Sequence, residues 1–363
     1  MCASANLHYA STTMASLDAN TRTAKRQVVG RFAPTPSGRM HLGNVFSALM
    51  AWLGARSAGG RMVLRIEDLD PRAQDREVSS LLMDDLHWLG LDWDEGPYFQ
   101  SERGELYSEA IKRLGEQGLT YPCFCTRSEL HAATAPHASD GTYVYQGTCR
   151  NLSPEEVARK ARLRPPATRL RVPSDEDPAG IISFDDEVYG HCSEVLAREC
   201  GDFLVRRSDG VIAYQLAVVV DDALMGVTQV VRGHDLLGSA ARQIYLQRLL
   251  GFEEPNYAHV PLLIDPDGRR LSKRDHDLDL DVIRDGGFSS RRVVGFLASL
   301  VGLAEKGEEV SADELVPRFS WNTLRNHRDD IVMEHGGFPP SKDVPRIRDG
   351  ERLRNFPTRK TGL

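Results

Sequence analysis

The chain has no long apolar run, few cysteines and no excess of positive charge, and each absence excludes a class of protein. No stretch approaches the roughly 20 apolar residues of a membrane span, so we expect a soluble protein. Six cysteines in 363 residues, without a secretory leader, indicate a reducing, cytoplasmic compartment. The formal net charge of −7 argues against nonspecific coating of nucleic acid. The 41% hydrophobic content predicts a globular chain of two or three domains.

Two common nucleotide-binding motifs are also missing, since the chain has neither GxxxxGK(S/T) nor the spaced glycines of a dinucleotide site. Residues 28–71 still have the pattern of a nucleotide-binding unit. An apolar strand begins at Val28, residues 61–66 predict a second strand, and apolar residues fill positions 45–53 between them. The end of this intervening helix is predicted at Gly54, Gly59 and Gly60. The order predicts a βαβ unit of a parallel sheet, with a nucleotide at the helix N-terminus.

The segment His41-Leu42-Gly43-Asn44 lies where this helix is predicted to begin. Gly43 has no Cβ, so an adenine or ribose can press against its backbone, and His41 can donate a hydrogen bond to a phosphate. A single histidine before a helix is more commonly an ordinary polar residue of a turn. The functional interpretation therefore depends on the motifs that accompany it.

Four motifs occur in a fixed order: RFAPTPSG (31–38), HLGN (41–44), RIEDLD (65–70) and GRRLSKR (268–274). In this order they resemble the class I aminoacyl-tRNA synthetases, and within them the glutamyl branch, from about Val28 to about Ile283. HLGN stands in the place of the HIGH signature of that class, and residues 270–274 in the place of KMSKS. Asn44 replaces the second histidine of HIGH, so it can donate a hydrogen bond but cannot become cationic.

The resemblance implies a set of site residues. Those expected to act in catalysis are His41, Asn44 and Lys273, and those expected to bind ATP are His41, Gly43, Asn44, Ser272 and Lys273. Those expected to bind the substrate glutamate are Arg31, Phe32, Ala33, Pro34, Thr35, Glu67, Tyr214 and Arg232. The chemistry agrees, because two arginines suit the two carboxylates of glutamate and Glu67 suits its ammonium group. Without the resemblance, Tyr214 would be interpreted as a core aromatic.

A cluster of cysteines between 121 and 150 predicts a metal site. Cys123 and Cys125 are separated by one residue, and Cys149 follows, so three thiolates could bind Zn²⁺ with one further donor. On chemical grounds His131 and His137 compete for that fourth position, because imidazole is the commoner zinc ligand. The pattern CxC then YxxxC resembles the zinc site of a shortened group within the glutamyl branch, and this resemblance implies Cys123, Cys125, Tyr145 and Cys149 as ligands.

A basic run follows the cysteine cluster. A helix is predicted to begin with Ser153 as N-cap and Pro154 at its first position. The stretch then carries Arg159, Lys160, Arg162, Arg164, Arg169 and Arg171. Such a run is commonly a solvated face, but its position beside the metal site makes it a candidate for contact with RNA phosphates.

Other elements are predicted from local patterns. Helices are predicted at 75–89, at 107–118 and beyond Ser289, and strands at 203–207 and 227–231. The apolar run 213–222 fits either type. Arg232 is expected directly after a strand, at the end where open α/β sheets bind their ligands. A tight turn is predicted at 265–268.

The predicted fold is α/β: a Rossmann-like parallel-sheet catalytic domain with a zinc-bearing insertion and a short helical C-terminal region. The boundaries expected are a disordered extension (1–26), the first half of the catalytic domain (27–120), the insertion (121–195), the second half with the KMSKS-like loop (196–283), a helical region (284–338) and a disordered tail (339–363).

The eighty residues after Ile283 are too few for the large helical anticodon-reading domain of full glutamyl-tRNA synthetases. The chain therefore resembles the shortened group, which implies activation of L-glutamate with ATP and Mg²⁺, and transfer to queuosine in the anticodon of tRNA(Asp), by a monomer. Two alternatives remain open at this point: a truncated glutamyl-tRNA synthetase that charges a tRNA 3′ end, and a catalytically silent tRNA-binding paralogue.

Overall fold

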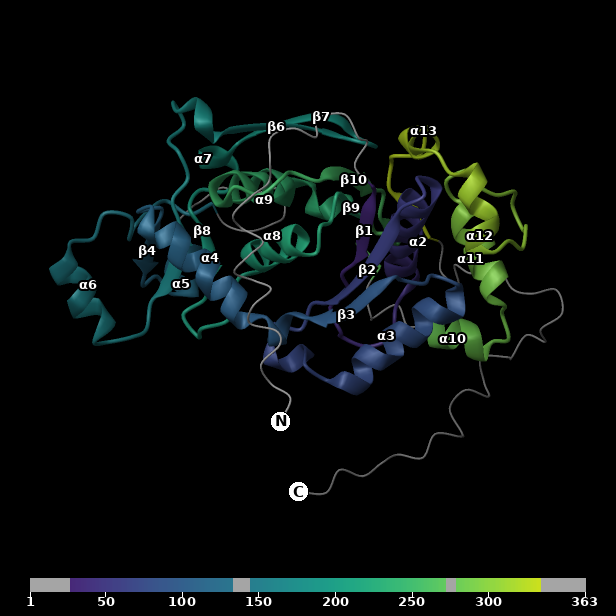
Figure 1. Ribbon diagram of the computed structural model, residues 1–363, viewed down its shortest axis with the longest axis horizontal. Coiled ribbons are helices and arrows are strands. Elements are labelled where there is room, and N and C mark those ends of the chain that lie inside the picture. Colours follow the sequence, from purple (N-terminus) through teal and green to yellow (C-terminus); the bar gives the residue numbers. More distant parts are fainter. Residues whose placement is uncertain (1–26, 133–143, 272–278, 334–363) are drawn as a thin grey trace, which may run out of the picture.

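The structure is a computed structural model that describes residues 27–132, 144–271 and 279–333 (Figure 1). Its strands are β1 (Val29–Phe32), β2 (Arg61–Ile66), β3 (Glu95–Phe99), β4 (Thr120–Cys123), β5 (Ala167–Leu170), β6 (Ile181–Asp186), β7 (Gly190–Val195), β8 (Phe203–Arg206), β9 (Gln229–Gly233), β10 (Asn256–Val260), β11 (Leu263–Ile264) and β12 (Ile331–Val332). Its helices are α2 (Leu42–Ser57), α3 (Arg76–Leu89), α4 (Gly104–Glu116), α5 (Arg127–Ala132), α6 (Pro154–Ala161), α7 (Leu196–Glu199), α8 (Tyr214–Leu224), α9 (Leu237–Leu250), α10 (Leu280–Asp285), α11 (Ser290–Ser299), α12 (Ala312–Leu315) and α13 (Trp321–Arg325).

Two sheets lie edge to edge and form the catalytic layer. One has the order β1-β2-β3, all parallel, and the other has the order β7-β6-β10-β9, in which only β7 runs antiparallel to its neighbour. Thr228, just before β9, donates its backbone N–H to the carbonyl of Val29 in β1 at 2.9 Å. The N–H of Val29 in turn donates to the hydroxyl of Thr228, also at 2.9 Å. The parallel βαβ unit predicted from the sequence is confirmed.

Helix α2 is longer than predicted, because Gly54 lies inside it and the helix continues to Ser57. A Cβ at Gly54 would lie 2.7 Å from the ring of Trp321 and 2.9 Å from the side-chain oxygen of Gln229. The glycine is therefore required by close packing against α13, and the prediction that it ends the helix is wrong. The predicted end at Gly59 and Gly60 is confirmed, because the helix stops at Ser57, just before Gly59, whose φ of 66° favours glycine.

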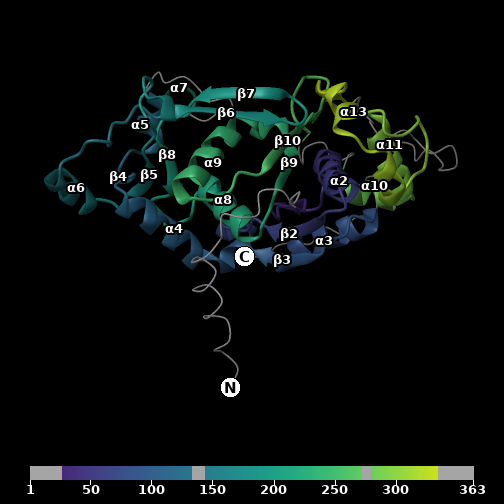
Figure 2. The same ribbon diagram turned by 45° about the horizontal axis from the view of Figure 1, so that its top comes forward.

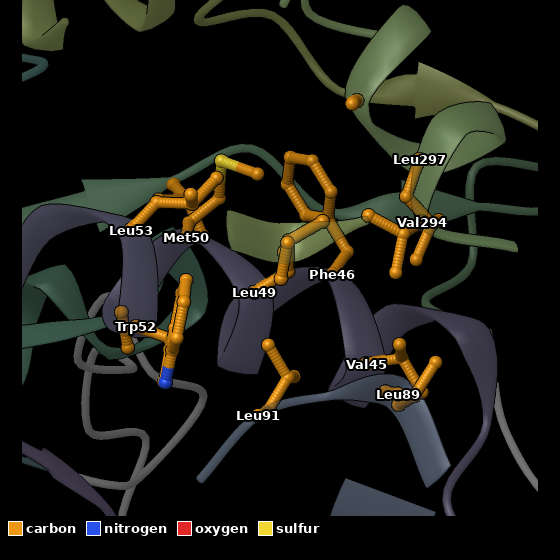
Figure 3. Packing of buried hydrophobic residues seen from close by; sticks show 14 of the residues in the cluster. Val45, Phe46, Leu49, Met50, Trp52, Leu53, Leu89, Leu91, Val294 and Leu297 are labelled. Atoms are coloured by element: carbon orange, nitrogen blue, oxygen red, sulfur yellow. The ribbon is translucent and has the colours of Figure 1, made fainter. Parts of the chain in front are cut away.

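The core lies around α2. Buried side chains of α2 face the C-terminal helices, and Figure 3 shows Val45 and Phe46 opposite Val294 and Leu297 of α11. Each such fully buried side chain contributes roughly 1.5–3 kcal/mol of transfer free energy. The short C-terminal helices therefore cover the catalytic layer and complete its core.

The insertion forms a small antiparallel sheet, β4-β5-β8, with α6 at its far end (Figures 1 and 2). Helix α6 begins as predicted, with Ser153 and Glu156 forming a reciprocal capping box and Pro154 at the first position. The predicted boundary at 195/196 does not follow the sheets. Strand β8, expected in the catalytic half, pairs with β5 of the insertion. The hairpin β6–β7, expected in the insertion, extends the catalytic sheet beside β10.

The ambiguous run 213–222 is helix α8, which is buried on most sides between α4 and α9. This burial explains why its sequence lacks an amphipathic period. The helices predicted at 75–89, near 107–118 and after Ser289 are confirmed as α3, α4 and α11, and Asp75 and Ser289 cap their helices as N-caps. None of the helices in the described ranges has the length and apolarity needed to cross a membrane.

Candidate active site and metal centre

A cavity of about 520 Å³ opens at the carboxyl ends of β1 and β9, the two strands at which the sheets meet. From β1 the chain crosses to β2 on one side, whereas β9 is followed by β10 on the other, so the cavity occupies a topological switch point. The predicted residues that line it are Arg31, Phe32, Ala33, Pro34, Thr35, His41, Asn44, Glu67, Tyr214 and Arg232. The sequence therefore named residues that the fold brings together from four separate segments.

The N-terminus of α2 faces this cavity through the HLGN segment. His41 is the N-cap residue, and its carbonyl accepts from the N–H groups of Asn44 and Val45 at 2.9 and 3.1 Å. The positive end of the helix dipole therefore lies where an anion would bind. Gly43 is close to the histidine, because a Cβ there would lie 3.1 Å from the ring of His41. Ser272 and Lys273 lie outside the described residues.

One end of the cavity is built from buried charges. Arg31 donates to the carbonyl of Val231 at 2.8 Å and lies 3.8 Å from Asp222. Glu67 accepts from Arg65 at 3.2 Å. Burial raises the pKa of Glu67, and the guanidinium groups of Arg65 and Arg31 oppose that rise. The two arginines thus favour an anionic Glu67, the state that could bind an ammonium group.

Behind these side chains lies an ionic network that our sequence reasoning missed. Arg65 is fully buried and donates to Asp222 at 2.6 Å. Burial alone would lower the pKa of Arg65, but the carboxylates of Asp222, Glu67 and Asp221 raise it. Asp221 accepts from the side chains of Gln100, Arg103 and Tyr107. The signal in the sequence was the acidic pair within the apolar run VVVDDAL, since buried carboxylates need partners.

Arg232 lies within β9, not after it as predicted, because this strand continues to Gly233. Its guanidinium donates to His259 Nε2 at 3.0 Å, to Gln243 Oε1 at 2.8 Å and to the carbonyl of Leu236 at 3.1 Å. Arginine carries five N–H donors, so one on each terminal nitrogen remains for a ligand. Two donors on neighbouring nitrogens match the two oxygens of a carboxylate.

Tyr214 is the first residue of α8 and lines the cavity. Burial raises the pKa of its phenol, so the hydroxyl stays protonated and can donate a hydrogen bond. The sequence alone favoured a core role for this residue. Its position in the cavity agrees instead with the family resemblance.

Near the N-terminus of α2, a buried carboxylate joins the segments around HLGN. Asp85 of α3 accepts from the side chain of Arg39 at 2.5 Å, from the backbone N–H of Met40 at 3.3 Å and from Arg284 of α10 at 3.2 Å. The N–H of Leu280 donates to the carbonyl of Met40 at 2.9 Å. Helix α10, which follows the KMSKS-like segment, is therefore bonded directly to the residues that precede α2.

The KMSKS-like segment begins at the cavity. Its first residue, Arg270, lines the cavity and forms an ion pair with Asp235. The predicted turn before it is confirmed, with the N–H of Gly268 donating to the carbonyl of Asp265 at 3.0 Å. A second cavity of about 310 Å³ shares Thr35, Ser37, His41, Asn44 and Arg270 with the first. Room for a ligand thus extends from the strand ends toward this segment.

The predicted metal ligands also come together. The Sγ atoms of Cys123, Cys125 and Cys149 lie within 4.8 Å of one another, and those of Cys125 and Cys149 are 3.6 Å apart. The hydroxyl of Tyr145 lies 3.6 Å from the Sγ of Cys123 and 3.5 Å from that of Cys125. Tetrahedral zinc with bonds of about 2.3 Å would separate its ligands by about 3.8 Å. These donors could therefore hold a metal ion, and their chemistry is compatible with zinc.

Burial and the neighbouring Arg169 shift the pKa values of the candidate ligands. Burial raises the pKa of Cys125 to about 11 and also raises that of Tyr145. For Cys123 burial acts in the same direction, but the backbone N–H of Cys125 and the guanidinium of Arg169 outweigh it, and the pKa is lowered. Arg169 Nε donates to the Sγ of Cys123 at 3.3 Å, and its guanidinium lies 3.7 Å from the centre of the Tyr145 ring.

Arg169 thus packs inside the candidate metal centre, 6% exposed, where it is not available to an RNA phosphate as its basic run suggested. Arg171 donates to the carbonyl of Arg150 and packs over the Tyr121 ring. Among the other cysteines in the described ranges, Cys192 and Cys200 form no disulfide. Of the two histidines that compete for the fourth position, His137 lies outside the described residues and His131 falls within α5.

Comparison with known proteins agrees with this geometry. Residues 27–335 match the family described as tRNA synthetases class I (E and Q), catalytic domain. The chain is 52% identical over 302 residues to a glutamyl-Q tRNA(Asp) synthetase of Symbiobacterium thermophilum, covering 80% of this chain and 91% of that one. It is 41% identical over 300 residues to a glutamate–tRNA ligase of Coprothermobacter proteolyticus, covering 82% of this chain and 63% of that one.

A solved structure is similar as well. The glutamate tRNA ligase from Elizabethkingia meningosepticum, crystallised in complex with its amino acid, superposes with a TM-score of 0.71 at 28% identity. The match covers 87% of this chain and 68% of that chain. The chain therefore belongs to the class I tRNA synthetases of the E and Q group, and among these ligases to the glutamyl-Q tRNA(Asp) synthetases.

Proposed function

We propose that this enzyme activates L-glutamate with ATP and transfers the glutamyl group to queuosine in the anticodon of tRNA(Asp). The observation that carries the proposal is the charge pattern of the cavity, where Arg31 and Arg232 flank a site that also contains Glu67 and Tyr214. Two guanidiniums complement the two carboxylates of glutamate, and the carboxylate of Glu67 complements its ammonium. A module that only bound RNA would have no need of such a cavity.

In the first step, an oxygen of the glutamate α-carboxylate attacks the α-phosphorus of ATP, and the bond to the β-phosphate oxygen breaks. The products are glutamyl-adenylate and pyrophosphate. We expect His41, Gly43 and Asn44 to bind the nucleotide at the N-terminus of α2, and Ser272 and Lys273 to stabilise charge as pyrophosphate leaves. Mg²⁺ is expected to accompany the triphosphate. Positioning and charge stabilisation would then supply most of the catalysis.

In the second step, a hydroxyl of queuosine attacks the activated carbonyl, AMP leaves, and the hydroxyl proton is released. The choice of queuosine is supported by the names of several relatives of similar length, including one 46% identical from Nocardia farcinica. Identity to the glutamate–tRNA ligase is lower, at 41%. Charging of an ordinary tRNA 3′ end is therefore the second candidate and is tested beside the first.

We also propose that Cys123, Cys125, Tyr145 and Cys149 hold one Zn²⁺. The support is the match between their separations and a tetrahedral site, together with the thiolate chemistry that zinc prefers. Bound here, zinc would join the CxC segment at the end of β4 to the segment that carries Tyr145 and Cys149. Its role would be structural, because the four protein donors leave no open position for a substrate.

The test combines two measurements on the purified full chain. Glutamate-dependent ATP–pyrophosphate exchange, with and without tRNA, measures the first step, and we expect exchange without tRNA. Transfer of radiolabelled glutamate to queuosine-bearing tRNA(Asp), to tRNA(Asp) lacking queuosine and to tRNA(Glu) measures the second, and we expect labelling only of the first of these. Labelling of tRNA(Glu) would favour the second candidate. No exchange with any amino acid, alongside measurable tRNA binding, would identify a silent paralogue.

A further inference from the structure

Strand β6 supplies the aspartates of two histidine–aspartate pairs of opposite character. His191 and Asp185 form a pair at 3.0 Å on the hairpin surface, with side chains 68% and 85% exposed. Asp186, the next residue, instead contacts His259 of β10 at 2.7 Å, and both of these side chains are fully buried. The adjacent residues Asp185 and Asp186 of β6 thus form one solvated and one buried pair with histidine.

The hydrogen bonds of the buried pair determine which ring nitrogen of His259 carries the proton. The Nε of Arg232 can only donate, so the Nε2 of His259, 3.0 Å away, must accept. The imidazole proton therefore lies on Nδ1, which donates to Asp186. Burial lowers the pKa of His259 to about 4, although Asp186 opposes this, so the ring is neutral near pH 7. Arg232 therefore donates to His259, and His259 donates to Asp186.

Asp186 is itself held rigidly. Its Oδ1 accepts from the backbone N–H groups of Val188 and Tyr189 at 2.9 and 3.0 Å, and its Oδ2 from the backbone N–H of His259 at 3.0 Å. On the other side of Arg232, Gln243 accepts from the guanidinium and donates to Gln215 at 2.8 Å. Of the three groups that accept from Arg232, His259 and Gln243 are buried and do not line the cavity, whereas the carbonyl of Leu236 belongs to a lining residue.

We propose that His259, oriented by Asp186, is a positioning residue that sets the rotation of the Arg232 guanidinium so that its two remaining N–H groups point at a substrate carboxylate. The inference rests on the proposed glutamate activation and deepens it. An arginine without a fixed orientation would still supply charge, but it would lose the paired geometry that distinguishes a carboxylate from an amide. His259 would thus contribute to the discrimination between glutamate and glutamine without touching either.

The test compares His259→Leu with His259→Gln in the full chain. Glutamine can reproduce the neutral imidazole, because its amide oxygen can accept from Arg232 and its amide N–H can donate to Asp186. In pyrophosphate exchange we expect His259→Leu to raise the KM for glutamate by roughly 10- to 100-fold, and the KM for ATP by less than about threefold. The preference for glutamate over glutamine in kcat/KM should fall, and His259→Gln should restore most of both quantities.

The matched control is His191→Leu, which removes the exposed histidine of the same hairpin and should leave both KM values unchanged. If His259→Leu does not fold, Asp186→Asn tests the same series of hydrogen bonds, because asparagine keeps the shape but has one acceptor oxygen, whereas Asp186 uses one oxygen for Val188 and Tyr189 and the other for His259. The KM for glutamate in Asp186→Asn should lie between that of the wild type and that expected for His259→Leu. Thermal melting of each variant separates loss of folded protein from loss of substrate binding.

Three results would overturn the inference. Equal effects of His259→Leu and His259→Gln on both KM values would show a merely structural role. A normal KM for glutamate in a folded His259→Leu or Asp186→Asn variant, with Arg232→Lys impaired, would reject positioning and leave the proposed function intact. Absence of glutamate-dependent exchange in the wild-type chain would reject the proposed function and the inference together.

Discussion

The cavity and the metal centre are both clusters of polar side chains, yet they are assembled in different ways. The metal donors lie between Cys123 and Cys149 and contact one another directly. The charged groups of the cavity come from β1, from Glu67 just after β2 and from β9, and their supporting partners extend to His259 of β10. One site is formed by a short segment, whereas the other is formed by the order of strands in a sheet.

This difference determines what holds each site together. Behind the cavity, buried charges are already paired, such as Arg65 with Asp222 at 2.6 Å, so the site is preorganised before a ligand binds. In the metal centre the raised pKa values of Cys125 and Tyr145 mean that these donors favour their protonated forms until a cation is present. We expect substitutions in and behind the cavity to impair glutamate activation strongly. Substitutions in the cysteine cluster should impair metal binding and change glutamate activation little.

The largest effect is expected from Asp222→Asn, which leaves the buried Arg65 with reduced charge compensation. Breaking a buried ion pair in this way costs roughly 3–5 kcal/mol, so the free energy of unfolding should fall by about 3 kcal/mol and glutamate activation should be lost with it. Urea denaturation measures the first quantity. Asp209→Asn is the matched control, because its pair with Arg207 is exposed and should cost less than about 1 kcal/mol. Equal losses in the two variants would contradict a special role for the buried network.

Lys273→Ala should have the next largest effect, on rate and not on stability. Loss of a group that stabilises charge in the transition state lowers kcat by roughly 100-fold or more. Single-turnover formation of glutamyl-adenylate measures this rate, and the melting temperature should stay unchanged. A rate equal to that of the wild type would show that the RLSKR segment is an ordinary surface loop.

The sequence separation of contacting residues decides which parts of this arrangement could be predicted. The HLGN segment, the βαβ unit and the metal donors were predictable because their residues are close in sequence and have characteristic spacing. The partners Asp222 and Asp186 were not, because Asp222 is 157 positions from Arg65 and Asp186 is 73 positions from His259. Only the strand order brings them together. The same reason explains Gly54, whose environment depends on Trp321 in a distant helix.

Arg232→Lys should impair glutamate use more than ATP use. An ammonium group keeps the charge but cannot reproduce the planar fork that binds His259, Gln243 and a carboxylate together. We expect the KM for glutamate to rise by roughly tenfold or more, with the KM for ATP changed by less than about threefold. Steady-state exchange assays at varied concentration of each substrate measure both. An unchanged KM for glutamate would remove Arg232 from the amino-acid site.

Cys149→Ser tests the proposed metal centre, and it should remove the metal while glutamate use is retained. Zinc content should fall to near zero, because two thiolates and a phenol hold the ion poorly, and the insertion should become more sensitive to proteolysis. The KM for glutamate should change by less than about threefold, since none of the described cavity-lining residues comes from the insertion. Elemental analysis and limited proteolysis provide the measurements. Full zinc content in this variant would exclude the proposed centre.

Tyr145→Phe should have the smallest effect and decides the identity of the fourth donor. The phenol lies 3.5 Å from the Sγ of Cys125 and accepts from the N–H of Cys149 at 2.7 Å, so it is in place to bind a metal but must lose a proton that burial retains. The charge of zinc can drive that loss. Without the hydroxyl, three thiolates and a water molecule can still complete a tetrahedron, so zinc affinity should fall while zinc content at saturation persists. His137→Ala is the matched variant for the imidazole alternative. Competition with a chelator of known affinity should show weaker zinc binding in Tyr145→Phe and wild-type binding in His137→Ala, and the opposite ranking would make His137 the fourth ligand.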